Sequence, residues 1–182
     1  MHVQEDYYHS QVMIKELASE LVEPSEGAMA RLKHLVRFLK GRTHEVKEMY
    51  MTNDRFGIDV HVDSNWAGCL KTSKSTDCVV LDVCGYKMIN SVKTQHPLAQ
   101  SSGEAELGGV HRGAILGVHV QNIWNELFRQ LLPITVFTDS AAGKVMATRR
   151  GVGRVRHLEV RRLYVQQLVN EGKVRLQKIS GQ

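Results

Sequence analysis

An alternating apolar segment, residues 57–63, constrains what this chain can fold into more than any other feature. Apolar side chains occupy every second position, at Ile58, Val60 and Val62. This alternation is typical of a strand with one buried face, and it ends on Asp63 before a turn of small residues. A second apolar run, residues 134–138, ends at Asp139 in the same way. If the two strands are parallel neighbours, both carboxylates meet at one edge of a sheet.

A further pair of acids stands where a helix is expected to begin. Ser101 is a plausible N-cap, and the predicted helix runs from residue 103 to about residue 130. Glu104 and Glu106 lie in its first turns, and residues two apart on a helix point about 200° apart. Only one of the two carboxylates can therefore face the sheet edge.

Strand–aspartate, helix–glutamate, strand–aspartate is the layout of a carboxylate site for Mg²⁺. This ion prefers oxygen ligands and supports phosphodiester chemistry. The alternative is that Asp63 and Asp139 are turn-forming and helix-capping residues, which are common roles for aspartate after a strand.

The remaining patterns complete an α/β order of three strands, a helix, a strand, two helices and a strand. We predict further strands over 78–84, 86–93 and 173–179, and further helices over 28–40, 139–146 and 156–170. The long helix carries Gly108, Gly109, Gly113 and Gly117, each of which costs about 1 kcal/mol relative to alanine. Either these glycines allow close packing on the sheet, or they record a sequence no longer under selection.

Positive charge is concentrated near the second aspartate. The chain's formal net charge is +5, which fits a polyanionic partner or ordinary solubility. Residues 144–162 hold one acid, Glu159, and seven basic residues: Lys144, Arg149, Arg150, Arg154, Arg156, Arg161 and Arg162. Such a cluster is suited to a phosphate backbone, and a solvated arginine-rich loop is the alternative. Lys71 and Lys74 lie in a polar loop that either contacts phosphate or is simply exposed.

The three cysteines, Cys69, Cys78 and Cys84, are odd in number and lack paired spacing. They favour a reducing compartment and disfavour a zinc site. The sequence shows neither a membrane-spanning stretch nor a signal peptide, so an intracellular, soluble protein is expected.

Five segments, taken together, resemble the ribonuclease H domain at the end of copia-type LTR-retrotransposon reverse transcriptases. They are VDSNWAG (62–68), SKST (73–76), SSGEAE (101–106), TDS (138–140) and RHLEV (156–160), in the family's order and spacing. Residues 24–41 also resemble the helix that precedes this domain in such polyproteins. The resemblance implies a ribonuclease H-like fold, a mixed five-stranded sheet flanked by helices, over residues 55–182. Residues 1–54 would be a helical remnant of the reverse-transcriptase connection region.

By the same resemblance, the chain would cut the RNA strand of RNA–DNA hybrids during reverse transcription, with Mg²⁺ or, in its place, Mn²⁺. Asp63 would bridge two ions about 4 Å apart, while Glu106 and Asp139 would each hold one. Glu106 precedes Leu107 and two glycines, which fits the family pattern better than Glu104 does. The macromolecular partners of the chain would be an RNA–DNA hybrid and the rest of the polyprotein. The location would be cytoplasmic particles and then the nucleus.

The match fails at the family's last acidic position, which would follow the final strand. The chain stops at Gln182, so we expect a domain truncated at its C-terminus. Glu159 and His157 are secondary candidates, with a surface acid and a packing histidine as the alternatives. A nucleic-acid-binding relic is a second hypothesis. The truncation, the helix glycines and Asn65, where the family usually has aspartate, favour it. An integrase-like nuclease is a third, which the contexts of Trp66 and His157 disfavour.

Overall fold

The computed structural model describes residues 8–42, 55–69, 71–96, 98–151 and 160–180. Its contacts divide the chain into two compact units, residues 1–49 and 50–182. The domain boundary expected after residue 54 lies at the edge of an undescribed segment and stays a prediction. Among the described residues, none of the helices is both long enough and apolar enough to span a membrane.

The first unit is helical. It holds the 3-10 turn η1 (Tyr8–Ser10), helix α2 (Gln11–Ser19) and helix α3 (Glu26–Lys40). The Ala28 amide donates a hydrogen bond to the Ser25 hydroxyl, which makes Ser25 the N-cap of α3, and the helix ends at Gly41. The helix predicted over residues 28–40 is therefore confirmed, with a start two residues earlier.

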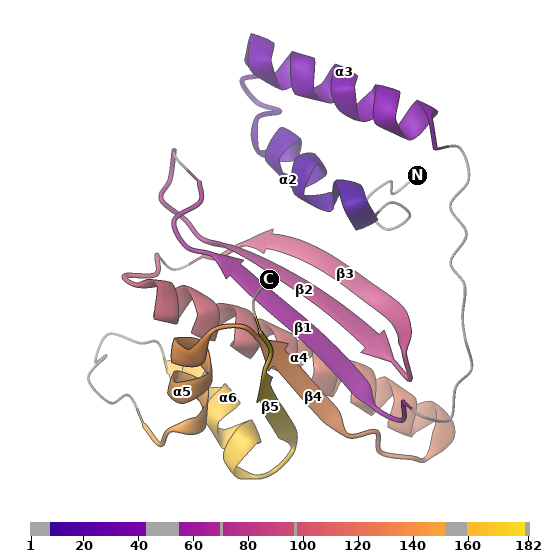
Figure 1. Ribbon diagram of the computed structural model, residues 1–182, viewed down its shortest axis with the longest axis vertical. Coiled ribbons are helices and arrows are strands. Elements are labelled where there is room, and N and C mark those ends of the chain that lie inside the picture. The colour runs from indigo at the N-terminus through magenta and orange to yellow at the C-terminus, as the bar shows by residue number, and fades with distance from the viewer. Residues whose placement is uncertain (1–7, 43–54, 70, 97, 152–159, 181–182) are drawn as a thin grey trace. The chain divides into compact units, whose positions relative to one another are not determined.

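The second unit is built on one mixed sheet. In chain order its elements are β1 (Ile58–Asn65), β2 (Thr76–Val83), β3 (Tyr86–Thr94), α4 (Ser102–Phe128), β4 (Ile134–Thr138), α5 (Ala141–Thr148), α6 (Val160–Asn170) and β5 (Val174–Lys178). The strand order is β3-β2-β1-β4-β5, so β1 lies at the centre (Figure 1). The strands β1, β2 and β3 pair antiparallel, whereas β4 runs parallel to both β1 and β5. This is the ribonuclease H-like, mixed five-stranded α/β arrangement expected from the sequence.

The register of the central pair decides where the two aspartates lie. The last aligned residues of β1 and β4 are His61 and Phe137. Asp63 and Asp139 each stand two residues further on, so the parallel register brings them to the same edge of the sheet. The expectation that the strand ends at Asp63 is wrong, because β1 continues to pair with β2 as far as Asn65.

Helix α4 covers the sheet and encloses the core. Side chains from β1, β2, β4, β5 and the three helices of this unit meet in one apolar cluster whose largest buried members include Ile58, Val60, Val79, Leu81, Leu107, Val110, Ile134, Val136, Leu168 and Val174. Burial of side chains of this size contributes about 1.5 to 3 kcal/mol each before conformational entropy is counted. The alternation in β1 therefore buries one face of the strand in this core, through Ile58, Val60 and Val62, and leaves the other face outside it.

Three glycines set how closely α4 approaches β1. Gly109, Gly113 and Gly117 recur every four residues and so share one face of the helix. A Cβ atom at Gly113 would lie 2.5 Å from Val62 Cγ1, and one at Gly117 would lie 2.9 Å from Ile134 Cγ2. The glycines therefore serve close packing, the first of the two readings that the sequence leaves open.

Gly113→Ala is expected to destabilise the protein although alanine favours helices. The clash with Val62 costs about 1 to 3 kcal/mol, while helix propensity returns only about 1 kcal/mol. Denaturant unfolding measures the difference. In a Val62→Ala background the 2.5 Å contact is gone and Val60 Cγ1, at 3.1 Å, is the tightest that remains, so Gly113→Ala is expected to destabilise much less there. Equal effects in both backgrounds would contradict this account of the packing.

Candidate metal centre

Two aspartates reach the sheet edge from neighbouring strands. Asp63 projects from β1 and Asp139 follows the last residue of β4, and both side chains are exposed. The position of Asp139 is fixed on either side. The Ser140 amide donates to the Thr138 hydroxyl (3.1 Å), and the Ser140 hydroxyl accepts from the Gly143 amide to cap α5. The Asp139 side chain therefore leaves a well-anchored turn.

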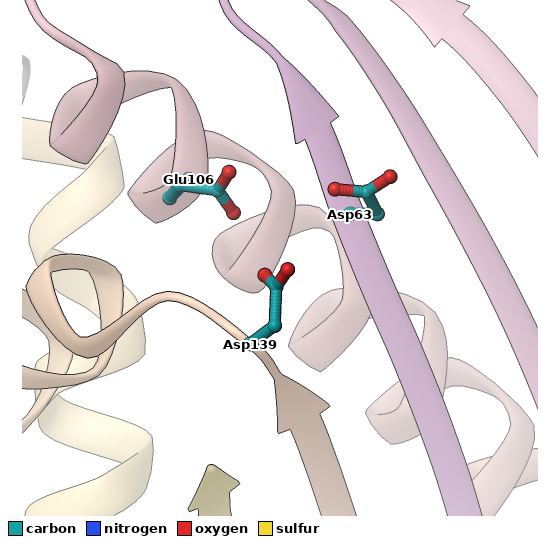
Figure 2. A group of neighbouring side chains, drawn as sticks. All are labelled: Asp63, Glu106 and Asp139. Carbon is teal, nitrogen blue, oxygen red and sulfur yellow. The ribbon is translucent and has the colours of Figure 1, made fainter. Parts of the chain in front are cut away.

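Glu106 completes the cluster from α4. One carboxylate oxygen each from Asp63, Glu106 and Asp139 lies within 4.8 Å of the other two. Figure 2 shows the three carboxylates turned toward one another from β1, α4 and the end of β4. Glu106 is only 7% exposed. A Cβ atom at Gly143 would lie 2.9 Å from the Glu106 Cβ, so α5 packs directly against this residue.

The environment of Glu106 opposes its negative charge. Burial, followed by the nearby charges of Asp139, Asp63 and Asp77, raises the pKa of this carboxyl to about 7. Its buried Oε2 atom has no hydrogen-bond partner among the described residues. A bound cation would satisfy this buried oxygen and offset the repulsion between the three carboxylates.

The donor set fits a divalent metal ion. It consists of three carboxylates, which are the hard oxygen ligands that Mg²⁺ and Mn²⁺ take. The orphaned Glu106 oxygen shows that the residues present do not satisfy this site by themselves. Among the described residues, this is the one group of three or more potential ligands that lie close enough to share an ion.

The structure separates Glu104 from Glu106. Glu104 is also buried, but its Oε2 atom accepts a hydrogen bond from the Gln100 amide (3.0 Å). Its own amide donates to the Ser101 hydroxyl, which confirms Ser101 as the N-cap of α4. Glu104 therefore closes the start of the helix, whereas Glu106 faces the two aspartates.

A cavity of about 340 Å³ adjoins the two aspartates. Its lining comprises His61, Val62, Asp63, Cys78, Val80, Asp139, Ile179 and Ser180. The His61 ring stacks on Phe137 with centroids 4.7 Å apart. Cys78 is the register partner of Asp63, and burial, followed by the Asp63 charge, raises the pKa of its thiol. The carboxylates thus border a hollow partly walled by apolar and aromatic groups.

The expected nucleic-acid contacts are only partly described. Lys71 and Lys74 lie in the loop between β1 and β2, with Lys71 exposed and Lys74 half-buried. Lys144 lies on α5, which begins two residues after Asp139, and Arg149 and Arg150 follow that helix. The last two expected contacts, Arg154 and Arg156, fall outside the described residues, as do the secondary site candidates His157 and Glu159.

Sequence reasoning missed Asp77, which is 4% exposed and contributes to the charge around Glu106. Its signal was faint. Asp77 stands next to Cys78 at the start of an apolar strand, where an acid reads as a solvent-facing residue. The alternation of buried residues in β2, followed back from Leu81 and Val79, places Asp77 on the inward face, and pairing with β1 sets it opposite Ser64.

Comparisons with known proteins give distant structural similarity. No protein family model matches the chain, and no curated protein matches it in sequence. One similar solved structure is LC11-RNase H1 in complex with an RNA/DNA hybrid, with 16% identity and a TM-score of 0.44 over 68% of this chain and 85% of that chain. Another is the foamy viral protease-reverse transcriptase dRH in complex with double-stranded DNA, with 10% identity and a TM-score of 0.49 over 94% of this chain and 30% of that chain. Similarity this distant leaves the chemistry of the site to be inferred from its own geometry.

The raised pKa of Glu106 predicts a pH-dependent metal affinity. The ion displaces the Glu106 proton, so Mg²⁺ is expected to bind about tenfold more tightly near pH 8 than near pH 6. Calorimetric titration at both pH values measures this. Glu106→Gln is expected to bind weakly without that pH dependence, and Glu104→Gln to keep it. Equal wild-type affinity at the two pH values would contradict the assignment.

The raised pKa of Glu106 also makes the stability of the metal-free protein depend on pH. The folded chain holds a proton on Glu106 up to about pH 7, whereas a carboxyl with the ordinary pKa of 4.5 has lost it by then. The contribution of this group to the free energy of unfolding therefore falls as pH rises from about 4.5 to about 7. Bound metal removes the penalty, which makes its stabilising effect largest above pH 7.

Proposed function

We propose that this chain is a ribonuclease H domain, a metal-dependent endonuclease that cleaves the RNA strand of RNA–DNA hybrids. One observation carries the proposal: three carboxylates from β1, α4 and the end of β4 meet within 4.8 Å, and one of them has a buried oxygen without a partner. The segments that resemble the copia-type domain supply the reaction class, and the strand order agrees with that fold.

The exposure of each carboxylate would decide its role in holding the ion. Asp63 and Asp139 are exposed, so they are free to hold a divalent ion that also contacts a substrate phosphate. Glu106 is buried between them and α5, so it would hold the ion from the protein side. When bound, divalent ions would supply Lewis-acid stabilisation of phosphodiester hydrolysis.

Substrate binding would depend on the backbone rather than on base sequence. Lys144 and Arg150 follow Asp139 on α5 and just beyond it, where they are placed to neutralise phosphates. The ribose 2′-hydroxyl is the group that distinguishes RNA from DNA, and the cavity beside Asp63 offers room for a sugar-sized group.

The biological setting follows from the resemblance. The domain would belong to the Pol polyprotein of a copia-type retrotransposon, with residues 1–54 as a remnant of the connection region. Its partners would be the RNA–DNA hybrid and the rest of the reverse transcriptase. It would act in cytoplasmic virus-like particles and in the nucleus.

A decayed, nucleic-acid-binding relic is the competing proposal. It depends on Asn65, at the exposed end of β1, and on a cluster that has three carboxylates among the described residues. The helix glycines no longer favour it, because they admit Val62, Ile134 and other core side chains.

Three isosteric substitutions test the proposed enzyme. Asp63→Asn, Glu106→Gln and Asp139→Asn are each expected to lower the cleavage rate of a labelled RNA–DNA hybrid in Mg²⁺ by at least about a hundredfold, because each removes one ligand charge. Glu104→Gln, on the same helix but outside the cluster, is the matched control and is expected to retain most activity. A folded wild-type protein that binds the hybrid without cutting it would support the relic instead.

The basic residues after Asp139 are tested by the salt dependence of hybrid binding. Lys144→Ala and Arg150→Ala are each expected to weaken binding and to reduce the slope of log Kd against log salt by about one. Fluorescence anisotropy over a salt series measures both quantities. Lys87→Ala is the control, since Lys87 pairs with Asp82 toward the far end of β2. The same loss of slope in Lys87→Ala would show that the effect reports net charge alone.

A further inference from the structure

A buried chain of hydrogen bonds joins the residues next to two of the three carboxylates. On the β1 side, the Ser64 hydroxyl donates to Asp77 Oδ1 at 2.9 Å, and Ser64 directly follows Asp63. Asp77 and Ser64 are 4% and 8% exposed. A Cβ atom at Gly109 would lie 2.4 Å from the Ser64 hydroxyl, so this bond forms in direct contact with α4.

On the helix side, Gln95 makes the connection. Its Nε2 donates both to Asp77 Oδ1 and to the main-chain carbonyl of Ala105, the latter at 2.7 Å. Ala105 directly precedes Glu106. Gln95 is 5% exposed, and a Cβ atom at Gly108 would lie 2.7 Å from its Nε2, so a larger residue at 108 would displace the amide from this position.

Main-chain bonds and Arg112 hold this chain of hydrogen bonds in place. The main-chain N–H of Gln95 donates to the main-chain carbonyl of Ser75 at 2.8 Å. This bond anchors the residue after β3 to the residue before β2. Arg112 donates to the Asp77 carbonyl at 3.3 Å and to the Ser91 hydroxyl. Arg112, which lies on α4, therefore links Asp77 in β2 to Ser91 in β3.

We propose that Asp77 and Gln95 are positioning residues that set the separation between Asp63 and Glu106. The path runs from Asp63 through Ser64 to Asp77, and through Gln95 and Ala105 to Glu106. This inference depends on the metal site in the proposed function. Hydrogen bonds made directly to metal ligands weaken metal affinity by about ten- to a hundredfold when lost. The bonds here act one residue away, on the main chain that carries Asp63 and Glu106, so an effect at the lower end of that range is expected.

Direct measurement of Mn²⁺ affinity, by calorimetry and by the electron paramagnetic resonance of free Mn²⁺, tests the inference. Gln95→Leu keeps the volume of the side chain but removes both donated bonds, and is expected to weaken Mn²⁺ binding about tenfold or more. Ser64→Ala, a smaller change that leaves the fold intact, is expected to weaken it several-fold. Unchanged affinity in both variants would overturn the inference.

Gln121→Leu is the matched control. Gln121 also lies on α4, and its Nε2 donates to the Leu132 carbonyl, but it stands 15 residues from Glu106, about 22 Å along the helix. The control is expected to lower the unfolding temperature while Mn²⁺ affinity stays the same. A loss of affinity equal to that of Gln95→Leu would show that any loosening of α4 suffices, which would overturn the positioning role.

A double variant separates positioning from general destabilisation. If Gln95 acts through Glu106, Gln95→Leu adds less than about threefold to the loss of Mn²⁺ affinity in Glu106→Gln. Full additivity would overturn that route.

The outcome is independent of catalysis: a wild-type chain that binds Mn²⁺ but cuts no hybrid would refute the proposed function and leave this inference standing. Absence of Mn²⁺ binding in the folded wild-type chain would refute both.

Discussion

The close approach of α4 to β1 is the constraint on which the rest of this structure depends. Three glycines at four-residue intervals let the helix backbone rest on side chains of the sheet: Gly109 on Ser64, and Gly113 and Gly117 on valine and isoleucine. Each glycine costs helix stability, and the core contacts offset that cost. The functional consequence lies at the helix start. A helix held further out by one methyl group at each contact would not bring Glu106 within 4.8 Å of two aspartates.

The same packing makes the site electrostatically unfavourable without a cation. The Glu106 Oε2 atom lacks a partner among the described residues, and burial, followed by three neighbouring acids, raises the pKa of this carboxyl. Folding therefore holds the carboxylates together against their repulsion, as expected where stability is given up for function. A divalent ion would neutralise them and satisfy the orphaned oxygen. The buried path through Asp77 and Gln95 supplies the stiffness that such an arrangement needs.

The sequence predicted the elements well because its patterns are local. Alternation in β1, the cap at Ser101 and the two-residue spacing of Glu104 and Glu106 each depend on neighbouring residues. What it did not predict depends on tertiary neighbours. The continuation of β1 past Asp63 follows from pairing with β2, and the same pairing sets Asp77 opposite its buried partner Ser64. The purpose of the glycines became clear only once the side chains facing them were known.

The most direct test of the account is the strand that the chain cuts and the ends that it leaves. Either strand of an RNA–DNA hybrid is labelled, and the purified chain is assayed in Mg²⁺ and in EDTA. Hydrolysis that releases the 3′ oxygen predicts cuts in the RNA strand alone, with 5′-phosphate and 3′-hydroxyl ends, in Mg²⁺ only. RNA cleavage that persists in EDTA, or that leaves 2′,3′-cyclic phosphate ends, would contradict a metal centre at Asp63, Glu106 and Asp139.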